Sequence, residues 1–84
     1  MIHGRVQGVG FRWYVRDHAR RLDIAGTVRN CTDGTVEVHA AAPETTLAAF
    51  RAILFSGPPG AQIERLVETT PSMHSLPSPF VILR

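Results

Sequence analysis

The segment between Gly4 and Arg12 has the residue types and spacing of an anion-binding loop. Gly4, Gly8 and Gly10 fall within seven positions of one another, and Arg12 follows them closely. Because glycine tolerates positive φ, successive backbone N–H groups in such a loop can converge on a single anion. An arginine beside the loop can then hold a phosphate or carboxylate through two parallel hydrogen bonds. This segment could therefore bind a small anion.

The residues after the loop support the same prediction. A helical repeat of apolar residues begins at Phe11, so the loop would lead directly into the N-terminus of a helix. Unpaired N–H groups and the positive end of the helix dipole favour an anion there. On glycine content alone, a tight strand–helix turn with a surface arginine explains the segment equally well. It matches neither a dinucleotide-binding fingerprint nor a Walker loop.

The distribution of charge also favours an anion site in the first third of the chain. All nine basic residues are arginines, and six of them lie in the first 29 positions, where the acidic residues are Asp17 and Asp23. The formal net charge is only +2, which is too small for a general nucleic-acid binder. We therefore expect a small anionic ligand and no nucleic acid.

The remaining chemically active side chains do not form a recognisable site. Cys31 is the single cysteine, which excludes an internal disulfide framework and a cysteine-caged zinc, and no partner for a nucleophilic thiol is evident. The histidines lack ligand spacing, so we expect no metal site; they are His3, His18, His39 and His74. Trp13 falls on the helix face away from Phe11 and Val15, where packing explains it better than a place at the mouth of the site.

The hydrophobic pattern predicts the elements that position the loop. Apolar residues recur every three or four positions from Phe11, and this first helix should end at Asp23. Pro43 opens a second helix, which the Gly-Pro-rich run at 56–60 stops. Strands are expected at 1–3, 27–30, 35–40, 62–69 and 80–83, with the loop itself at 4–10 and a hairpin turn at 32–34.

This order, βαββαββ, predicts an α+β fold: a ferredoxin-like two-layer sandwich with a mostly antiparallel sheet and both helices on one face. A length of 84 residues allows one domain, 1–84. The composition, 44% hydrophobic and 19% charged, is globular, without a bilayer-length apolar run or a signal peptide. We expect a small monomeric protein of the cytoplasm that does not bind membranes. The fold alone does not fix its function.

Three blocks of residues resemble the acylphosphatase family in type, order and spacing. The first is Gly-Arg-Val-Gln-Gly-Val-Gly-Phe-Arg at 4–12. The second joins Gly-x-Val-Arg-Asn at 26–30 to Asp-Gly-Thr-Val-Glu at 33–37, and the third is Gly-Pro-Pro-x-Ala at 57–61. The resemblance covers nearly the whole chain. It implies the ferredoxin-like sandwich reached above and the hydrolysis of carboxyl-phosphate anhydrides without a metal or another cofactor.

The resemblance also implies roles for individual residues. Arg12 corresponds to the phosphate-binding arginine of the family, and Asn30 to the asparagine that orients the attacking water. Backbone amides of the loop would cradle the phosphate oxygens; they belong to Arg5, Val6, Gln7, Gly8 and Val9. The implied substrate is a small acyl phosphate, with inorganic phosphate as product and competitive inhibitor.

Some positions depart from the family pattern. Asp23 follows the first helix where glycine is common, Thr27 replaces a frequent tryptophan, and Ala42 occupies a usual glycine position. Only residues 1–3 precede the loop, which shortens the first strand. None of these changes touches Arg12 or Asn30, so we expect them to lower stability more than activity.

Two alternative functions belong to different classes of protein. Similar domains begin the hydrogenase-maturation carbamoyltransferases, which handle carbamoyl phosphate, but those usually have proline where this chain has Trp13. Since the last expected strand is complete near Arg84, we expect a free-standing enzyme. RNA-recognition modules share the topology but stack bases on aromatic residues of central strands, and the strand at 35–40 has none.

Overall fold

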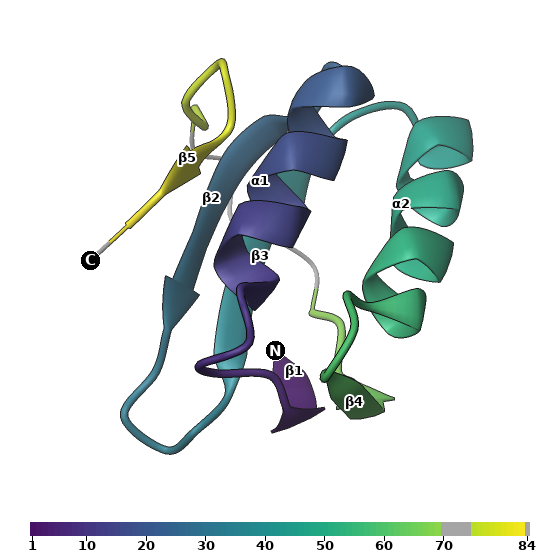
Figure 1. Cartoon of the computed structure of the whole chain (residues 1–84). Coiled ribbons are helices and arrows are strands. Elements are labelled where there is room, and N and C mark those ends of the chain that lie inside the picture. The colour runs from purple at the N-terminus through teal and green to yellow at the C-terminus, as the bar shows by residue number, and fades with distance from the viewer. Residues whose placement is uncertain (70–74, 84) are drawn as a thin grey trace.

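The computed structural model describes residues 1–69 and 75–83 of the chain, so His74 lies outside the described residues. Their order is β1 (Ile2–Arg5), α1 (Phe11–Arg21), β2 (Ala25–Asn30), β3 (Val36–Ala41), α2 (Glu44–Ser56), β4 (Gln62–Leu66) and β5 (Val81–Ile82). This confirms the predicted βαββαββ order (Figure 1).

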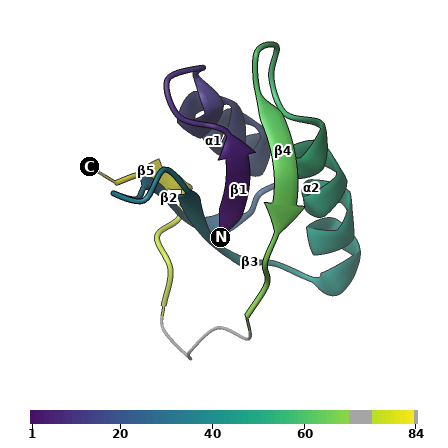
Figure 2. The ribbon, with the colours of Figure 1, turned by 90° about the horizontal axis from the view of Figure 1, so that it is seen from below.

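The strands of the described residues form one five-stranded sheet in the order β4-β1-β3-β2-β5. Every neighbouring pair is antiparallel except β2 and β5, which are parallel. Both helices cover the same face of this sheet, as Figure 2 shows from below. The α+β ferredoxin-like sandwich is therefore confirmed. Since β1 and β3 are neighbours, the loop after β1 and the turn between β2 and β3 are held at the same edge.

The first strand extends further than the sequence predicts. Gly4 and Arg5 were expected in the loop, but they pair with Ile63 and Gln62 of β4, after a register shift between His3 and Gly4. A side chain at Gly4 would collide with the backbone oxygen of Gln62, and its φ is +134°. Glycine is therefore required where β1 passes β4, and the free loop begins only at Val6.

The first helix begins at Phe11, as the sequence predicts, and ends at Arg21, two residues before the predicted end at Asp23. Phe11, Val15 and Ala19 are buried against the sheet, which confirms the repeat of apolar residues. The Tyr14 hydroxyl donates to the Ile53 carbonyl at 2.7 Å and joins the two helices. After the helix, Asp23 adopts a φ of +61°, the left-handed conformation that a short polar side chain tolerates better than most. No helix of the described residues is long and apolar enough to cross a bilayer.

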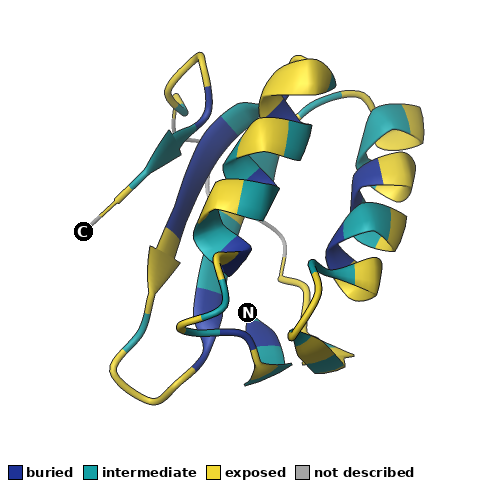
Figure 3. Ribbon diagram, in the orientation of Figure 1, coloured by how far each residue is buried: buried dark blue, intermediate teal, exposed yellow. Residues whose placement is uncertain are grey.

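The core lies between the helices and the sheet. Buried residues lie on β2 and on the inner sides of both helices (Figure 3). Phe80, just before β5, is fully buried and meets Phe50 of α2 edge to face, with ring centroids 6.3 Å apart. The buried hydrophobic side chains are those of Ile2, Val6, Phe11, Val15, Ala19, Ile24, Val28, Val36, Phe50, Leu54 and Phe80.

Candidate active site

The loop from Val6 to Gly10 connects the central strand to the first helix and presents backbone N–H groups. Gly8 and Gly10 have φ values of +77° and +76°, so both use the left-handed conformation that the glycine spacing predicts. Gly10 is the N-cap of α1 and offers no side-chain cap. The first turn of α1 contains no acidic residue. An external anion can therefore satisfy the N–H groups at this helix end.

A small cavity joins this loop to the carboxyl end of β2. Its volume is about 130 Å³. The loop and the end of β2 lie side by side at the lower left of Figure 1. The lining residues come from the loop, the first turn of α1 and β2; they are Val6, Gly8, Gly10, Phe11, Arg12, Trp13 and Asn30. The structure thus brings Arg12 and Asn30, which are far apart in the sequence, to one cavity.

Arg12 is the cation of this cavity. Its side chain is half-buried in the first turn of α1. In the part of the chain that the structure describes, no ion pair or side-chain hydrogen bond involves Arg12, whereas Arg16, Arg29 and Arg51 all pair with carboxylates. Both edges of the Arg12 guanidinium are therefore available to an incoming anion.

The other predicted loop residues have different positions. Val6 and Gly8 line the cavity, while Arg5, Gln7 and Val9 do not. Arg5 ends β1 with an exposed side chain, and Val9 packs against the core. The predicted phosphate contacts of these residues use backbone amides, so their side chains are not required for phosphate binding.

The Gln7 side chain has a structural role that the sequence did not predict. Its Nε2 donates to the carbonyl of Cys31 at 2.8 Å and to that of Thr35 at 3.0 Å. These carbonyls flank the turn between β2 and β3, next to Asn30. Gln7 therefore clamps the loop to the segment that carries Asn30. Spacing gave no sign of this, because the partners are backbone atoms distant in the sequence.

Two further interactions fix the segment around Asn30. Asp33 accepts hydrogen bonds from the Thr35 hydroxyl at 2.6 Å and the Thr35 amide at 3.0 Å, and these bonds hold the pKa of Asp33 below its usual value. Arg29 donates to Glu37 across the strands at 2.6 Å, which lowers the pKa of Glu37. The charge of Arg29 is thus matched by a neighbour.

Trp13 lies at the edge of the cavity with 55% of its surface exposed. The Arg16 guanidinium is positioned over its ring, 4.2 Å from the centroid. The expected packing role is therefore a surface contact with Arg16, and Trp13 also lines the site.

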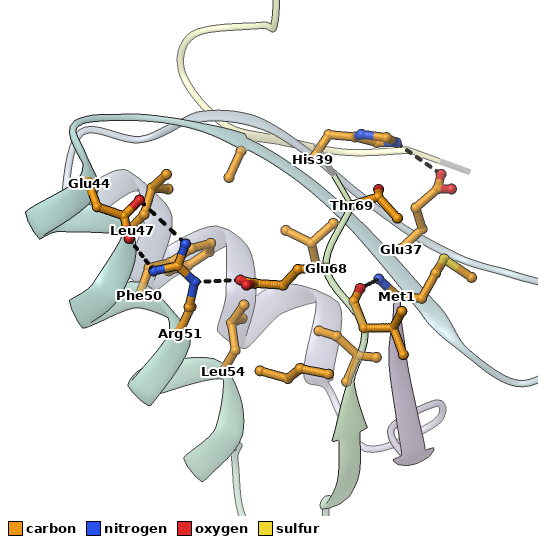
Figure 4. A pocket seen from close by; sticks show the side chains of 15 residues that line it. Met1, Glu37, His39, Glu44, Leu47, Phe50, Arg51, Leu54, Glu68 and Thr69 are labelled. Carbon is orange, nitrogen blue, oxygen red and sulfur yellow. Dashed lines mark hydrogen bonds and ion pairs between the residues drawn. The ribbon is translucent and has the colours of Figure 1, made fainter. Parts of the chain in front are cut away.

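A larger cavity, of about 750 Å³, lies at the opposite end of β1 (Figure 4). Met1, residues of β3 and the inner side of α2 line it, and Arg51 spans its rim between Glu44 and Glu68. Within the described residues β1 pairs with β3 at Ile2 alone, so the sheet is open there. Neither Arg12 nor Asn30 lines this cavity, and none of the other predicted site residues does so.

No three or more His, Cys, Asp or Glu residues of the described chain come together in a way that could hold a metal ion. The three described histidines, His3, His18 and His39, do not converge. The site consists of one free guanidinium, one carboxamide and the backbone N–H groups of a loop and a helix. Such a set can bind a dianion and orient a neutral molecule beside it.

Comparisons with known proteins agree with this geometry. The family model described as Acylphosphatase matches residues 1–82. The chain is 51% identical over 72 residues to the acylphosphatase of Synechococcus sp. strain CC9605, covering 86% of this chain and 83% of that protein. It is 40% identical over 81 residues to the acylphosphatase of Rhizobium etli, covering 96% and 86% of the two chains.

Solved structures show the same likeness. The crystal structure of acylphosphatase from Bacillus subtilis superposes with a TM-score of 0.85 at 34% identity, covering 99% of this chain and 92% of that one. HypF from T. kodakarensis superposes with a TM-score of 0.81 at 32% identity, but the match covers 96% of this chain and only 11% of HypF. The second likeness is therefore to one domain of a much larger protein.

Proposed function

Since the chain belongs to the acylphosphatase family and hydrolyses acyl phosphates, we propose that Arg12 and the loop amides hold the phosphoryl group while Asn30 orients the attacking water. The supporting observation is the small cavity, which combines Arg12, the glycine loop and Asn30. The reaction breaks the bond between phosphorus and the bridging oxygen. Water adds to phosphorus, and the acyl group leaves as a carboxylate.

The chemistry of the leaving group explains why so few residues suffice. A carboxylic acid has a pKa of about 4, so its carboxylate departs without a general acid. The transition state of phosphoryl transfer is loose, with charge spread over three equatorial oxygens. The protein therefore has to hold those oxygens and position a water, and neither a carboxylate pair nor a metal ion is needed in this mechanism.

Arg12 and the loop act on the phosphoryl oxygens. The unpaired guanidinium forms two hydrogen bonds to them, and the amides of Arg5–Val9 and the N-terminus of α1 supply further donors. These donors are fixed before the substrate arrives, because Gln7 holds the loop to the β2–β3 turn. Preorganised donors stabilise the charge of the transition state without reorganising during the reaction.

Asn30 acts on the water. A carboxamide can accept a hydrogen bond from water through its oxygen and donate one to a phosphoryl oxygen through its nitrogen. Asn30 lies at the end of β2, across the loop from the first turn of α1. A water takes about 30 Å³, so the cavity of about 130 Å³ has space for it beside the phosphoryl group.

Hydrolysis of benzoyl phosphate in excess chelator tests this mechanism. We expect the same kcat with and without chelator, and competitive inhibition by inorganic phosphate, which fits the same donors. Loss of activity on chelation that a divalent ion restores would contradict the metal-free mechanism. The monomeric state, the cytoplasmic location and the absence of nucleic-acid binding stay predictions from the sequence.

A further inference from the structure

One large aromatic side chain at the mouth of the catalytic cavity has no role in the mechanism above. Trp13 lines the cavity together with Arg12 and Asn30, yet 55% of its surface is exposed. Large aromatic side chains are normally mostly buried, and one exposed beside a binding cavity is available to a ligand. Trp13 lines the same cavity as Arg12, so it borders the position proposed for the bound phosphoryl group.

The indole ring is held in place by its neighbours on α1. The Arg16 guanidinium lies 4.2 Å from the ring centroid, a cation–π arrangement. Asp17 in turn accepts hydrogen bonds from Arg16 Nη2 at 2.9 Å and from Nε at 3.1 Å. Asp17 therefore orients Arg16 and offsets its charge, and Arg16 covers one face of the ring. The contacts from Asp17 to Arg16 and from Arg16 to Trp13 restrict the indole ring, so little side-chain entropy is lost when a ligand binds to it.

The geometry of the reaction places the acyl group near this surface. Attacking water and leaving group lie in line on opposite sides of phosphorus. Asn30 belongs to β2, whereas Trp13 belongs to α1 on another side of the cavity. With water held by Asn30, the acyl group emerges away from β2, at the mouth. The cavity is too small to enclose both ends of a substrate that carries an aromatic ring.

We propose that Trp13, backed by Arg16, is an acyl-group subsite that favours acyl phosphates with planar aromatic acyl groups over those with small ones. This inference rests on the proposed function, because it presumes that the phosphoryl group lies beside Arg12. Stacking of an aromatic acyl group on the indole adds binding that an acetyl group cannot obtain. Selectivity then appears in the ratio of kcat/KM for the two kinds of substrate.

The test compares benzoyl phosphate with acetyl phosphate in the native protein and in Trp13→Ala. An aromatic pair contributes about 0.5–1.5 kcal/mol beyond area burial, so removing it should lower kcat/KM for benzoyl phosphate by about 2- to 13-fold. Acetyl phosphate hydrolysis should fall less than benzoyl phosphate hydrolysis, so the ratio of the two kcat/KM values falls, and the inhibition constant of inorganic phosphate, which has no acyl group, should change less than twofold. Trp13→Phe should keep most of the selectivity, and Arg16→Gln should lose part of it.

Phe55 provides a matched control. It is an exposed aromatic residue on α2, also 55% exposed, and it does not line the cavity. Phe55→Ala should leave kcat/KM unchanged for both benzoyl phosphate and acetyl phosphate. An unchanged benzoyl-to-acetyl ratio in Trp13→Ala, with phosphate inhibition intact, would overturn the subsite. Failure of the native protein to hydrolyse either substrate would instead overturn the proposed function, so the two failures are distinguishable.

Discussion

Replacing Gln7 tests whether the phosphate loop and the segment that carries Asn30 work as one unit. Gln7→Met keeps the length of the side chain and removes its hydrogen-bond donors. Gln7→Ala shortens the side chain and also removes the donors. Each variant loses the hydrogen bonds to Cys31 and Thr35. The loop would then be tied to the rest of the site only through its two ends.

The loss of stability depends on which hydrogen bonds the Cys31 and Thr35 carbonyls still accept without Gln7. The Cys31 carbonyl still accepts from the Gly34 amide at 3.2 Å, and the Thr35 carbonyl from the Cys31 amide at 2.8 Å. No orphaned acceptor is created, so the loss is the net value of two hydrogen bonds, about 1–3 kcal/mol in total. For a domain of this size that corresponds to a Tm lower by about 4–24 °C.

Activity should fall beyond what unfolding explains. A loop displaced by about 1 Å misplaces the phosphoryl group relative to Asn30, and such errors cost roughly 10- to 100-fold in kcat/KM. Thermal unfolding and steady-state hydrolysis of benzoyl phosphate, measured where the variants are fully folded, separate the two effects. Gln62→Ala, at an exposed glutamine of β4, is the control. A Gln7→Met protein with native Tm and native kcat/KM would refute the reasoning.

Two further predictions concern stability. The Thr35 hydroxyl and amide lower the pKa of Asp33 in the folded protein. The ionised Asp33 therefore stabilises the fold above the pKa that this residue has in the unfolded chain, and this stabilisation is lost as the pH falls through its pKa in the folded protein. Asp33→Asn should therefore flatten the fall in Tm below about pH 4, and parallel curves of Tm against pH would contradict this. Gly4→Ala should cost about 2–5 kcal/mol in urea unfolding, from left-handed strain plus the clash with Gln62. Gly34→Ala, with open space around it, should cost only about 1–2 kcal/mol; equal losses would count against the clash.

Local pattern was enough to predict the fold. The apolar repeat that starts at Phe11 and the alternation along β3 each reflect burial on one face, and burial is what the two-layer architecture requires. The boundaries of β1 were wrong, because pairing of Gly4 and Arg5 depends on a strand more than fifty positions later. Glycine spacing could not distinguish a glycine that turns the chain from one that lets two backbones approach.

The candidate site was only partly predictable for the same reason. Family resemblance singled out Arg12 and Asn30, and the structure places both at one cavity, although their roles stay a prediction. The Gln7 clamp escaped prediction because a side chain that bonds to distant backbone carbonyls leaves no periodic trace. Trp13 looked like a packing residue because a helical wheel shows which way a side chain faces and not what lies beyond it.

The division of roles between Arg12 and Asn30 is tested most directly by measuring phosphate affinity and kcat on Arg12→Ala and Asn30→Ala. Arg12 meets the phosphoryl oxygens in ground and transition states, so its loss should weaken phosphate binding and also slow turnover. Arg12→Lys should recover only part of this, because an ammonium cannot form the paired contact. Asn30→Ala should keep near-native phosphate affinity while kcat falls by roughly 100-fold or more. A folded Asn30→Ala protein that loses phosphate binding as severely as Arg12→Ala would contradict the account.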